Sequence, residues 1–302
     1  MTLQQLNYVI VISETGSMNK AAELLYIAQP SLTSAVKELE KEIGITIFNR
    51  SGRGVTLTAD GEEFLTYARQ VYQQYESLKQ KYTGGNVRKK FGVSAQHYSF
   101  AVEAFVTMVR QFGTADYDFA IRETKTAEVI DDVKNLKSEI GVLYLSDFNR
   151  QIMTKLFHAD HLEFHSLIKC RPCVYLWKGH PSAERKSVSI SELVEYPCLT
   201  FEQGDKSSFY YAEEIFSTGE LSRVIRACDR STMLNLMKGL DGYTFCSGII
   251  CGELNGPEYT ALPIEGESDL MEIGYITRKN AVPTELGKAY VEELKAILFT
   301  QG

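Results

Sequence analysis

Hydrophobic positions at the start of the chain recur at helical spacing in three short segments. Leu3, Leu6, Val9, Ile10 and Ser13 recur at helical spacing, and alanines and leucines continue this spacing between Ser17 and Leu25. A third helix is expected to begin near Gln29-Pro30. Proline has no backbone N–H, and in the first turn of a helix that group would have no partner within the helix. Gly44 suits the left-handed residue that ends a helix. The pattern predicts a module of three short helices.

A short hairpin and a long helix are expected to follow these helices. Ile45 to Phe48 have the pattern of a strand, residues 49–54 contain two glycines and two arginines, and Val55 to Leu57 return as a second strand. A helix is expected from Thr58 to about Tyr82. Its apolar residues recur in alternating steps of four and three: Phe64, Ala68, Val71, Tyr75, Leu78 and Tyr82. Such a seam is typical of two helices in contact between copies of a chain, although one helix packed on its own domain gives the same pattern.

The rest of the chain alternates between strand-like and helix-like patterns. The expected strands are Phe91–Ser94, Tyr117–Arg122, Ile140–Leu145, Phe164–Leu167, Cys173–Trp177, Cys198–Phe201 and Met271–Thr277. The expected helices are Phe100–Phe112, Ala127–Leu136, one that opens near Ser191–Leu193, Asp205–Ser217, Thr232–Leu240 and Pro283–Phe299. This alternation indicates βαβ units, and therefore an α/β fold with a parallel sheet.

Composition and charge narrow the classes of function. The 302 residues are 44% hydrophobic and 24% charged, which is typical of a soluble globular protein with room for two or three domains. No apolar run is long enough to span a membrane, and no basic segment precedes the first apolar residues, so no membrane partner is expected and the protein is expected to be cytoplasmic. Residues 1–90 carry 11 Lys and Arg against 9 Asp and Glu, whereas residues 91–302 carry 21 against 30. The net charge of −7 therefore does not exclude a nucleic acid as partner of the first module.

The predicted third helix carries short polar side chains and a lysine opposite its apolar stripe. Such side chains near a helix N-terminus suit base edges and phosphates in a DNA groove, and arginines at a hairpin tip suit the DNA backbone or minor groove. The alternative is a three-helix interaction module with a solvated polar face. The candidate DNA-contacting residues are Ser17, Asn19, Lys20, Gln29, Pro30, Ser31, Leu32, Thr33, Ser34, Lys37, Arg50 and Arg53.

Residues 17–61 resemble the winged helix-turn-helix of LysR-type transcriptional regulators. The matching positions are Ser17, Ala21-Ala22, Gln29-Pro30-Ser31, Leu39-Glu40, Gly44, Phe48-Asn49-Arg50, Leu57-Thr58 and Gly61. Ala28 departs from the family pattern, in which a serine commonly caps the helix before Gln-Pro. Loss of such a cap costs on the order of 1 kcal/mol.

The resemblance implies a regulator rather than an enzyme, with an α/β fold overall. The implied domains are a mostly α winged helix-turn-helix at 1–58, a linker or dimerisation helix at 59–88, and an effector-binding domain at 89–302 with two α/β subdomains similar to a periplasmic binding protein, 91–161 plus 268–302 and 162–267. The implied partners are double-stranded promoter or operator DNA, a small-molecule effector, and further copies of the chain in a homodimer or homotetramer. No cofactor and no metal ion is implied.

Ligands in such sheets bind in the crevice beyond the carboxyl ends of the strands, so residues that follow predicted strands are candidates for the effector site. Hydroxyls before a helix suit a carboxylate, and an arginine suits the same group. The alternative for each residue alone is a helix cap or a turn. The candidates are Ser94, Gln96, His97, Ser99, Thr124, Tyr144, Ser146, Phe201, Glu202, Gln203, Arg230, Thr232 and Ser247. The expected effector is a carboxylate or an amino-acid or sulfur metabolite.

Two other functions are weighed against this hypothesis. Cys170 and Cys173 have the two-residue spacing of redox and zinc pairs, which would suit a cysteine-based redox or metal sensor of the same fold. No second such pair accompanies them, and scattered core cysteines are the simpler interpretation. An enzyme is disfavoured because no nucleophile elbow, P-loop or Rossmann glycine set is present. The histidines at 158, 161 and 165 are predicted to lie in a solvated connection that enters a strand.

Overall fold

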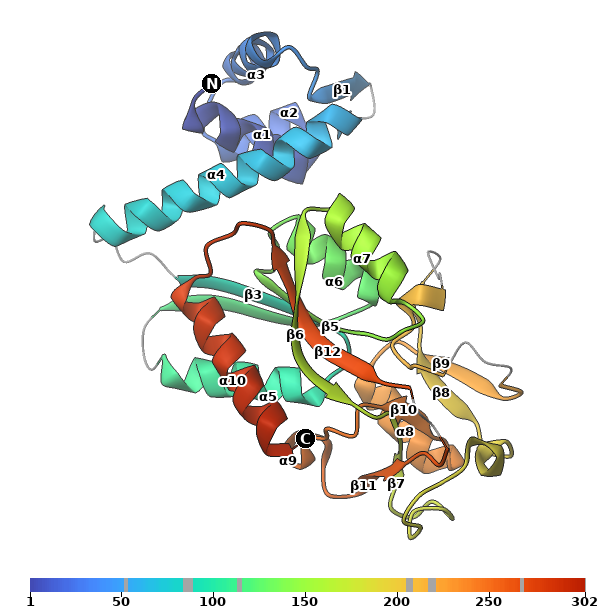
Figure 1. Ribbon diagram of the computed structural model, residues 1–302. Coiled ribbons are helices and arrows are strands. Elements are labelled where there is room, and N and C mark those ends of the chain that lie inside the picture. The colour runs from blue at the N-terminus through green and yellow to red at the C-terminus, as the bar shows by residue number, and fades with distance from the viewer. Residues whose placement is uncertain are drawn as a thin grey trace. The chain divides into compact units, whose positions relative to one another are not determined.

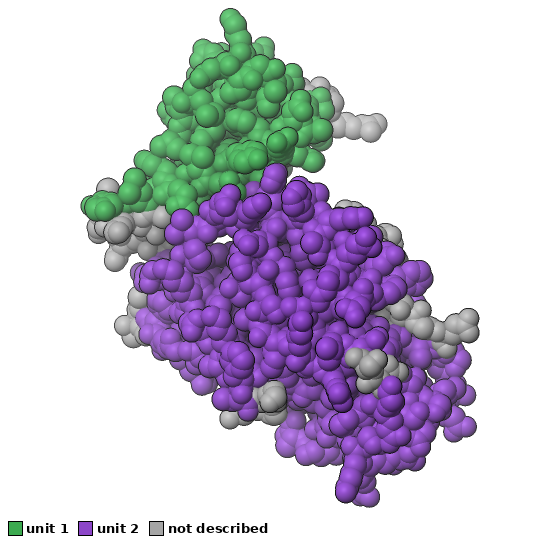
Figure 2. All heavy atoms as spheres, viewed as in Figure 1, with its two compact units in different colours: residues 1–87 green, residues 88–302 purple. Residues whose placement is uncertain are grey.

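The chain forms two compact units. The computed structural model describes residues 1–302 apart from 52–53, 84–88, 113–115, 205–208, 217–220, 267–268 and 302. The units are Met1–Val87 and Arg88–Gly302, coloured separately in Figure 2. The division lies one residue from the implied boundary between the linker helix (59–88) and the effector-binding domain (89–302).

The first unit contains three helices, a hairpin and a long helix (Figure 1). They are α1 (Leu3–Thr15), α2 (Met18–Leu24), α3 (Gln29–Ile43), β1 (Phe48–Ser51), β2 (Gly54–Leu57) and α4 (Ala59–Thr83). Thr2 caps α1 with a complete capping box, and Ser17 caps α2 by accepting a backbone N–H. Gly16 and Gly44 end α1 and α3 with φ angles of 62° and 76°. These local signals explain why the predicted helices are confirmed.

The helices and hairpin of this unit enclose one core. Its buried residues include Val9, Ile12, Ala21, Ala22, Leu32, Val36, Leu39, Ile47, Phe48 and Leu65. Gly61, in the first turn of α4, lies against Ile47: a Cβ added to Gly61 would be 2.1 Å from the Ile47 carbonyl oxygen. Glycine is therefore required for α4 to begin this close to the hairpin.

The character of α4 changes along its length. Ala68 is 2% exposed and belongs to the part of the helix that packs on its own unit beside α1. Val71, Leu78 and Tyr82 are 50%, 59% and 73% exposed. The predicted apolar seam thus has a buried first part and an exposed second part.

The second unit is organised around a five-stranded sheet. Its order is β4-β3-β5-β12-β6, from β4 (Tyr117–Glu123), β3 (Lys89–Ala95), β5 (Ile140–Leu145), β12 (Met271–Arg278) and β6 (Leu162–Cys170). The strands β4, β3 and β5 are parallel, whereas β12 is antiparallel to both β5 and β6. The predicted parallel sheet is therefore confirmed for these three strands. β12 extends the sheet in the opposite direction, and β6, on the far side of β12, runs in the same direction as β5.

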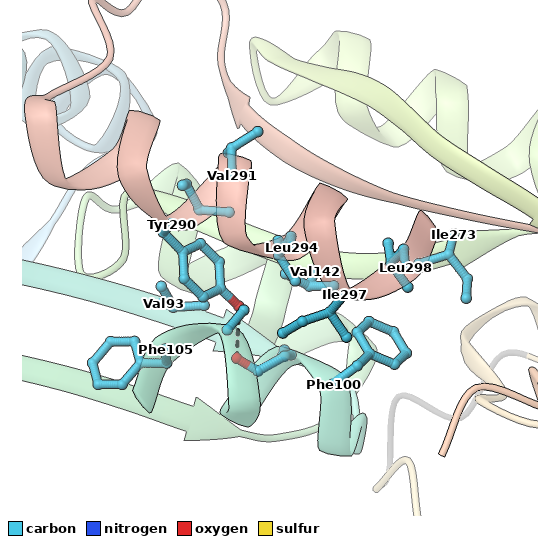
Figure 3. Packing of buried hydrophobic residues seen from close by; sticks show 14 of the residues in the cluster. Val93, Phe100, Phe105, Val142, Ile273, Tyr290, Val291, Leu294, Ile297 and Leu298 are labelled. Atoms are coloured by element: carbon cyan, nitrogen blue, oxygen red, sulfur yellow. Dashed lines mark hydrogen bonds between the residues drawn. The ribbon is translucent and has the colours of Figure 1, made fainter. Parts of the chain in front are cut away.

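Helices cover both faces of this sheet (Figure 1). The pair α5 (Ser99–Gln111) and α10 (Glu285–Gln301) packs on one face, and the pair α6 (Thr126–Lys134) and α7 (Arg150–Ala159) on the other. Figure 3 shows Tyr290 of α10 among Val93, Phe105 and Leu294 in the first layer. The buried Tyr290 hydroxyl donates to the Ala101 carbonyl at 3.1 Å, so the ring packs in the core without leaving its polar atom unpaired.

A second group of strands forms a smaller lobe. β7 (Cys173–Trp177) pairs antiparallel with β10 (Thr244–Cys246) and β11 (Tyr259–Pro263), and β8 (Cys198–Phe201) pairs parallel with β9 (Val224–Ala227). A bridge between Cys198 and Tyr243 joins the two sets. The lobe also contains α8 (Arg230–Leu240), α9 (Gly252–Asn255) and the 3-10 segments Ile190–Leu193 and Phe209–Tyr211. Trp177, the one tryptophan of the sequence, donates from Nε1 to Asp241 Oδ1 at 2.8 Å.

Two connections, from β6 to β7 and from β11 to β12, join the larger lobe (residues 89–170 and 271–301) to the smaller lobe (residues 173–263). The expected subdomain boundary at 162 is wrong by one strand, because β6 pairs with β12 along its whole length. Hydrogen bonds to the neighbouring strand place these residues in the larger sheet.

Two other expectations are wrong. The helix predicted over Asp205–Ser217 is absent from its described part: only Phe209–Tyr211 forms a 3-10 turn. The Tyr211 and Ala212 carbonyls accept side-chain hydrogen bonds from Thr126 and Tyr144, and these long-range bonds replace those of a helix. The histidine segment is not a solvated loop throughout, because His158 lies in the last turn of α7 and His165 lies in β6, where its ring contacts the Thr277 hydroxyl.

Candidate nucleic-acid interface and ligand cavity

The N-terminal half of α3 presents a polar face to solvent. Gln29, Ser31, Ser34 and Lys37 are exposed, and the Gln29 amide donates to Thr33 Oγ1 at 3.0 Å, one turn along the helix. Pro30, also exposed, occupies the first turn, and Ala28 makes no side-chain cap bond, as its lack of a hydroxyl predicts. These short side chains and one cation lie on one side of a helix whose other side is core.

Leu32 does not belong to this face. It is 0% exposed and packs in the core with Val36 and Leu39, which lie four and seven positions further along α3. The prediction that Leu32 contacts DNA is therefore wrong, because the helical period places it on the buried stripe.

The helix before α3 adds exposed polar groups. Asn19 and Lys20 are exposed, whereas Ser17 is half-buried and its hydroxyl caps α2. The turn between α2 and α3 contains Tyr26, which is 95% exposed and has a φ of 55°. A bulky residue in the left-handed region is uncommon, and no pattern in the sequence indicates it.

The hairpin has the predicted order of strands. Arg50 pairs with Val55 in the β1–β2 register. The Arg50 side chain and the whole of Arg53 lie outside the described residues. There is no room for a side chain at Gly54, because an added Cβ would lie 2.9 Å from the Gly16 carbonyl oxygen. The hairpin therefore packs closely on the α1–α2 turn.

A cavity of about 80 Å³ lies where the two lobes of the second unit meet. The larger lobe contributes residues that follow β3, and the smaller lobe contributes parts of β7, α8 and β10. Five of the predicted effector residues line it: His97, Ser99, Phe201, Arg230 and Ser247. Sequence reasoning missed other lining residues, among them Tyr175, Glu213, Glu214, Thr244 and Asn255.

The remaining predicted effector residues do not line the cavity. Ser94 is buried beside α6, where its hydroxyl donates to Asp132 Oδ2 at 2.6 Å, because alternate residues of a strand point to opposite faces. Gln96 donates to the Thr126 hydroxyl and accepts from the Tyr98 hydroxyl and the Tyr144 N–H, and it does not line the cavity. These two predictions are wrong.

Several others serve as caps or lobe contacts. Thr124 bonds to Glu128, Ser146 is buried with its backbone bonded to Asn149, and Glu202 accepts from Cys228. The Thr232 backbone N–H donates to the Asp229 side chain, which caps α8, so Thr232 belongs to a helix cap. Tyr144 and Gln203 contact the other lobe instead of the cavity.

Residues 209–216 of the smaller lobe occupy the carboxyl ends of β3 and β5. Thr126 and Tyr144 donate to the carbonyls of Tyr211 and Ala212 at 2.8 and 3.1 Å. The Glu213 carboxylate accepts from the His97 N–H at 3.0 Å and lies 2.8 Å from His97 Nδ1. The chain's own segment thus fills part of the crevice in which a ligand is expected.

Two acidic side chains, Glu213 and Glu214, are neighbours here but have different hydrogen-bond partners. Glu213 is held by His97 and by the Gln203 amide, which donates at 2.8 Å. Burial, helped by neighbouring Glu213, raises the pKa of Glu214 well above its usual range, which favours the protonated form of this carboxyl. The ring of His97 stacks on Phe201 with centroids 3.7 Å apart.

Arg230 is the cation of the cavity. Its guanidinium forms an ion pair with Glu123 at the end of β4, and its Nη1 donates to Asn255 Oδ1 at 3.3 Å. Burial lowers the pKa of Arg230 to about 10, so it stays charged at neutral pH. The Arg230 Nε and the Thr244 hydroxyl are buried with no hydrogen-bond partner among the described residues.

Three cysteines gather near the junction of the lobes. Cys173 is opposite Cys246 in the β7–β10 pair, and Cys170 ends β6, with two residues between it and the start of β7. Burial raises the pKa of Cys170 to about 11, of Cys246 to about 12, and also of Cys173. These groups are thiols at neutral pH. Within the described part of the chain, no three His, Cys, Asp or Glu side chains are arranged to hold a metal ion.

Among the described residues, no helix combines the length and the apolar character that a membrane span needs. Residues 3–62 match the model of the bacterial regulatory helix-turn-helix proteins of the lysR family, and residues 96–298 match that of the LysR substrate binding domain. The second match alone covers more than half of the chain.

Individual relatives agree with these matches. The chain is 30% identical to the HTH-type transcriptional regulator AlsR of Bacillus subtilis over 66% of this chain and 64% of AlsR. It is 24% identical to the uncharacterized regulator YdcI of Escherichia coli over 92% and 90% of the two chains. Among solved structures, full-length OxyR of Pseudomonas aeruginosa has a TM-score of 0.66 at 17% identity, covering 99% of this chain and 94% of that one, a likeness of fold.

Proposed function

The chain belongs to the LysR family of DNA-binding transcriptional regulators, and from this premise we propose how it contacts DNA, assembles and responds to a ligand. The proposed DNA contact is α3 in the major groove, with Gln29, Ser31, Thr33, Ser34 and Lys37 toward base edges and phosphates. The observation that supports this proposal is that four of these residues are exposed, and Thr33 is half-buried, on a helix whose opposite face packs in the core of the unit.

The surrounding polar groups are proposed as backbone contacts. Asn19 and Lys20, both exposed, follow the cap of α2 and are proposed to reach phosphates beside the groove. Arg50 and Arg53 of the hairpin are proposed to contact the backbone or minor groove, on the strength of their sequence positions.

A homodimer or homotetramer is proposed through α4. Val71, Tyr75 and Leu78 are exposed at seam positions on the part of the helix beyond its own core. A second copy of the helix would cover them, and two heads would then reach paired half-sites on DNA.

The cavity between the lobes is proposed as the effector site. It combines apolar walls with Arg230 and several hydroxyls, a composition suited to a small polar molecule. Glu123 and Arg230 form an ion pair between the two lobes. A ligand that contacts Arg230 would therefore change the relative stability of different lobe arrangements. This population shift is proposed to alter DNA binding.

The alternative function, a cysteine-based redox or metal sensor, finds less support. Oxidation requires the thiolate, and the raised pKa of Cys170, Cys173 and Cys246 keeps that form scarce at neutral pH. The three thiols do lie near the lobe junction, so peroxide and a chelator are informative additions to a DNA-binding assay: a large response to either would favour the alternative.

Replacement of Lys37 by Ala tests the DNA contact. Loss of one phosphate contact should weaken binding of the full chain to its operator about tenfold and lower the slope of log affinity against log salt by about one. Fluorescence anisotropy across a salt series measures both. Lys288→Ala is the matched control, because Lys288 is an exposed lysine on α10 of the other unit. An unchanged slope for Lys37→Ala would remove Lys37 from the interface.

A further inference from the structure

The cavity contains more hydrogen-bond donors than acceptors for them. Arg230 Nε and Thr244 Oγ1 are buried without a hydrogen-bond partner among the described residues, and both residues line the cavity. Thr244 is only 6% exposed, so water at the surface cannot satisfy its hydroxyl. Leaving such groups unpaired is costly, and a ligand with acceptor atoms would remove that cost.

Three further hydroxyls on the cavity wall have protons to give. Ser99 accepts from the Cys251 N–H, Ser247 accepts from the Ile249 N–H, and Tyr175 accepts from the Asn255 amide. A hydroxyl that accepts a hydrogen bond still has one proton to donate. Among the described residues, these three protons have no acceptor. The wall therefore favours a ligand group that accepts hydrogen bonds and donates none, and a carboxylate is such a group.

The acidic residues of the wall are already engaged. The Glu213 carboxylate lies against the backbone N–H and ring of His97 and accepts from Gln203. The Glu214 Oε1 accepts from the Phe201 N–H at 2.8 Å, and burial raises the pKa of this carboxyl well above its usual range, which disfavours its charged form. A ligand ammonium would find no free carboxylate here, which disfavours amino acids.

The size of the cavity limits the ligand further. A water molecule needs on the order of 10–15 Å³ of such space, so about 80 Å³ admits roughly five to eight non-hydrogen atoms. Met233, Leu234 and Ile249 supply apolar wall for a short alkyl group. We propose that the cavity binds a monocarboxylate of about two to four carbon atoms that carries no ammonium group. This inference rests on the proposed function, in which the cavity is the effector site.

The same geometry says how such a ligand would act. Arg230 on α8 is ion-paired to Glu123 on β4, so the guanidinium joins the two lobes. A ligand carboxylate on Arg230 competes with Glu123 for one cation. Binding therefore weakens a contact between the lobes, and the ligand reaches the rest of the protein through that exchange.

Calorimetric titration of the full chain tests the ligand class. Acetate, propionate and butyrate are the probes, with sodium chloride at equal ionic strength as the blank. Their amides have the same shape without the charge, and alanine adds an ammonium to propionate. Saturable binding of a carboxylate, at least tenfold tighter than its amide and than alanine, is the expected result.

Variants tie the binding to the named groups. Arg230→Gln should abolish detectable carboxylate binding, and Thr244→Val, which keeps the shape of the side chain, should weaken it about tenfold. Glu123→Gln should tighten binding about tenfold, because it removes the competing carboxylate. Thr260→Val on β11, a threonine outside the cavity, is the matched control and should bind as the unchanged protein does.

Each outcome decides the proposal. Tighter binding of alanine than of propionate, equal binding of amides and carboxylates, or absence of binding for all three carboxylates overturns it. Weaker binding in Glu123→Gln overturns the proposed competition. Operator binding is measured on the same preparations: a chain that binds operator DNA but no carboxylate loses only the ligand class, whereas a chain that binds no DNA contradicts the proposed function itself.

Discussion

The nucleic-acid interface and the ligand cavity are assembled in opposite ways. The proposed DNA-contacting residues lie within positions 17–53, and five of them belong to the exposed or half-buried face of a single helix, α3. The cavity draws on residues from His97 to Met271, on two lobes and several elements. An interface on one helix depends on helical periodicity and on the core beneath it. A cavity between lobes depends on long-range contacts, and it changes when those contacts change.

The largest expected effect tests the core beneath the interface. Leu32→Ala should lower the free energy of unfolding of the first unit by about 3 kcal/mol, because it leaves a void among Val36, Leu39 and their neighbours. Ser34→Ala, on the exposed face of the same helix, should change it by less than about 0.5 kcal/mol. Urea denaturation followed by circular dichroism measures both. Equal free energies of unfolding for the two variants would mean that Leu32 lies on the exposed face.

The second effect concerns the lobes and depends on pH. The pKa of Glu214 is raised in the folded protein, so the stability contributed by its protonated form is complete below the unfolded pKa near 4.5 and is lost as pH rises through the folded value. Glu214→Gln stays uncharged, and its stability relative to the unchanged protein should therefore rise with pH.

Thermal denaturation of both proteins from about pH 5 to about pH 9 measures this difference. The other titratable groups nearby, which include Glu213, His97, Tyr98 and Tyr144, are present in both proteins, so the difference reports Glu214. Two parallel pH profiles would mean that Glu214 is ionised in the folded chain.

The smallest expected effect is local to the turn before α3. Tyr26 has a φ of 55° and is 95% exposed, so its side chain contributes little packing to offset a strained backbone. Asparagine tolerates this conformation, and Tyr26→Asn should stabilise the first unit by roughly 0.5 to 1 kcal/mol. Tyr26→Phe keeps the strain and serves as control. A gain shared by both variants would point to the hydroxyl rather than to the backbone.

The sequence predicts the two regions unequally, and the same physical difference explains why. The helices of the first unit follow from capping residues and period, which act over a few positions. The prediction for Leu32 places it on the wrong face of α3. Its spacing to Val36 and Leu39 is that of the buried stripe, so the sequence already contains the correct answer. Only the local signals of Thr2, Ser17, Gly16 and Gly44 are needed to place the helix ends.

The cavity shows what local reasoning misses. His97, Phe201 and Arg230 are found because they follow strands or open a helix, but Ser94 points to the other side of its strand. Glu213 reaches the cavity only because residues 209–216 cross to the larger lobe through bonds to Thr126 and Tyr144. No pattern within residues 205–217 announces those bonds, which connect positions more than sixty residues apart.

The single tryptophan gives the smaller lobe an optical label of its own. Trp177 ends β7, its indole is held to Asp241, and the absence of a side chain at Gly179 leaves room for its ring. Ultraviolet emission excited at the indole band therefore comes from one place in the chain, far in sequence from the DNA-binding helices. A shift in its wavelength would follow the loosening of that lobe in real time, without any dye or engineered tag.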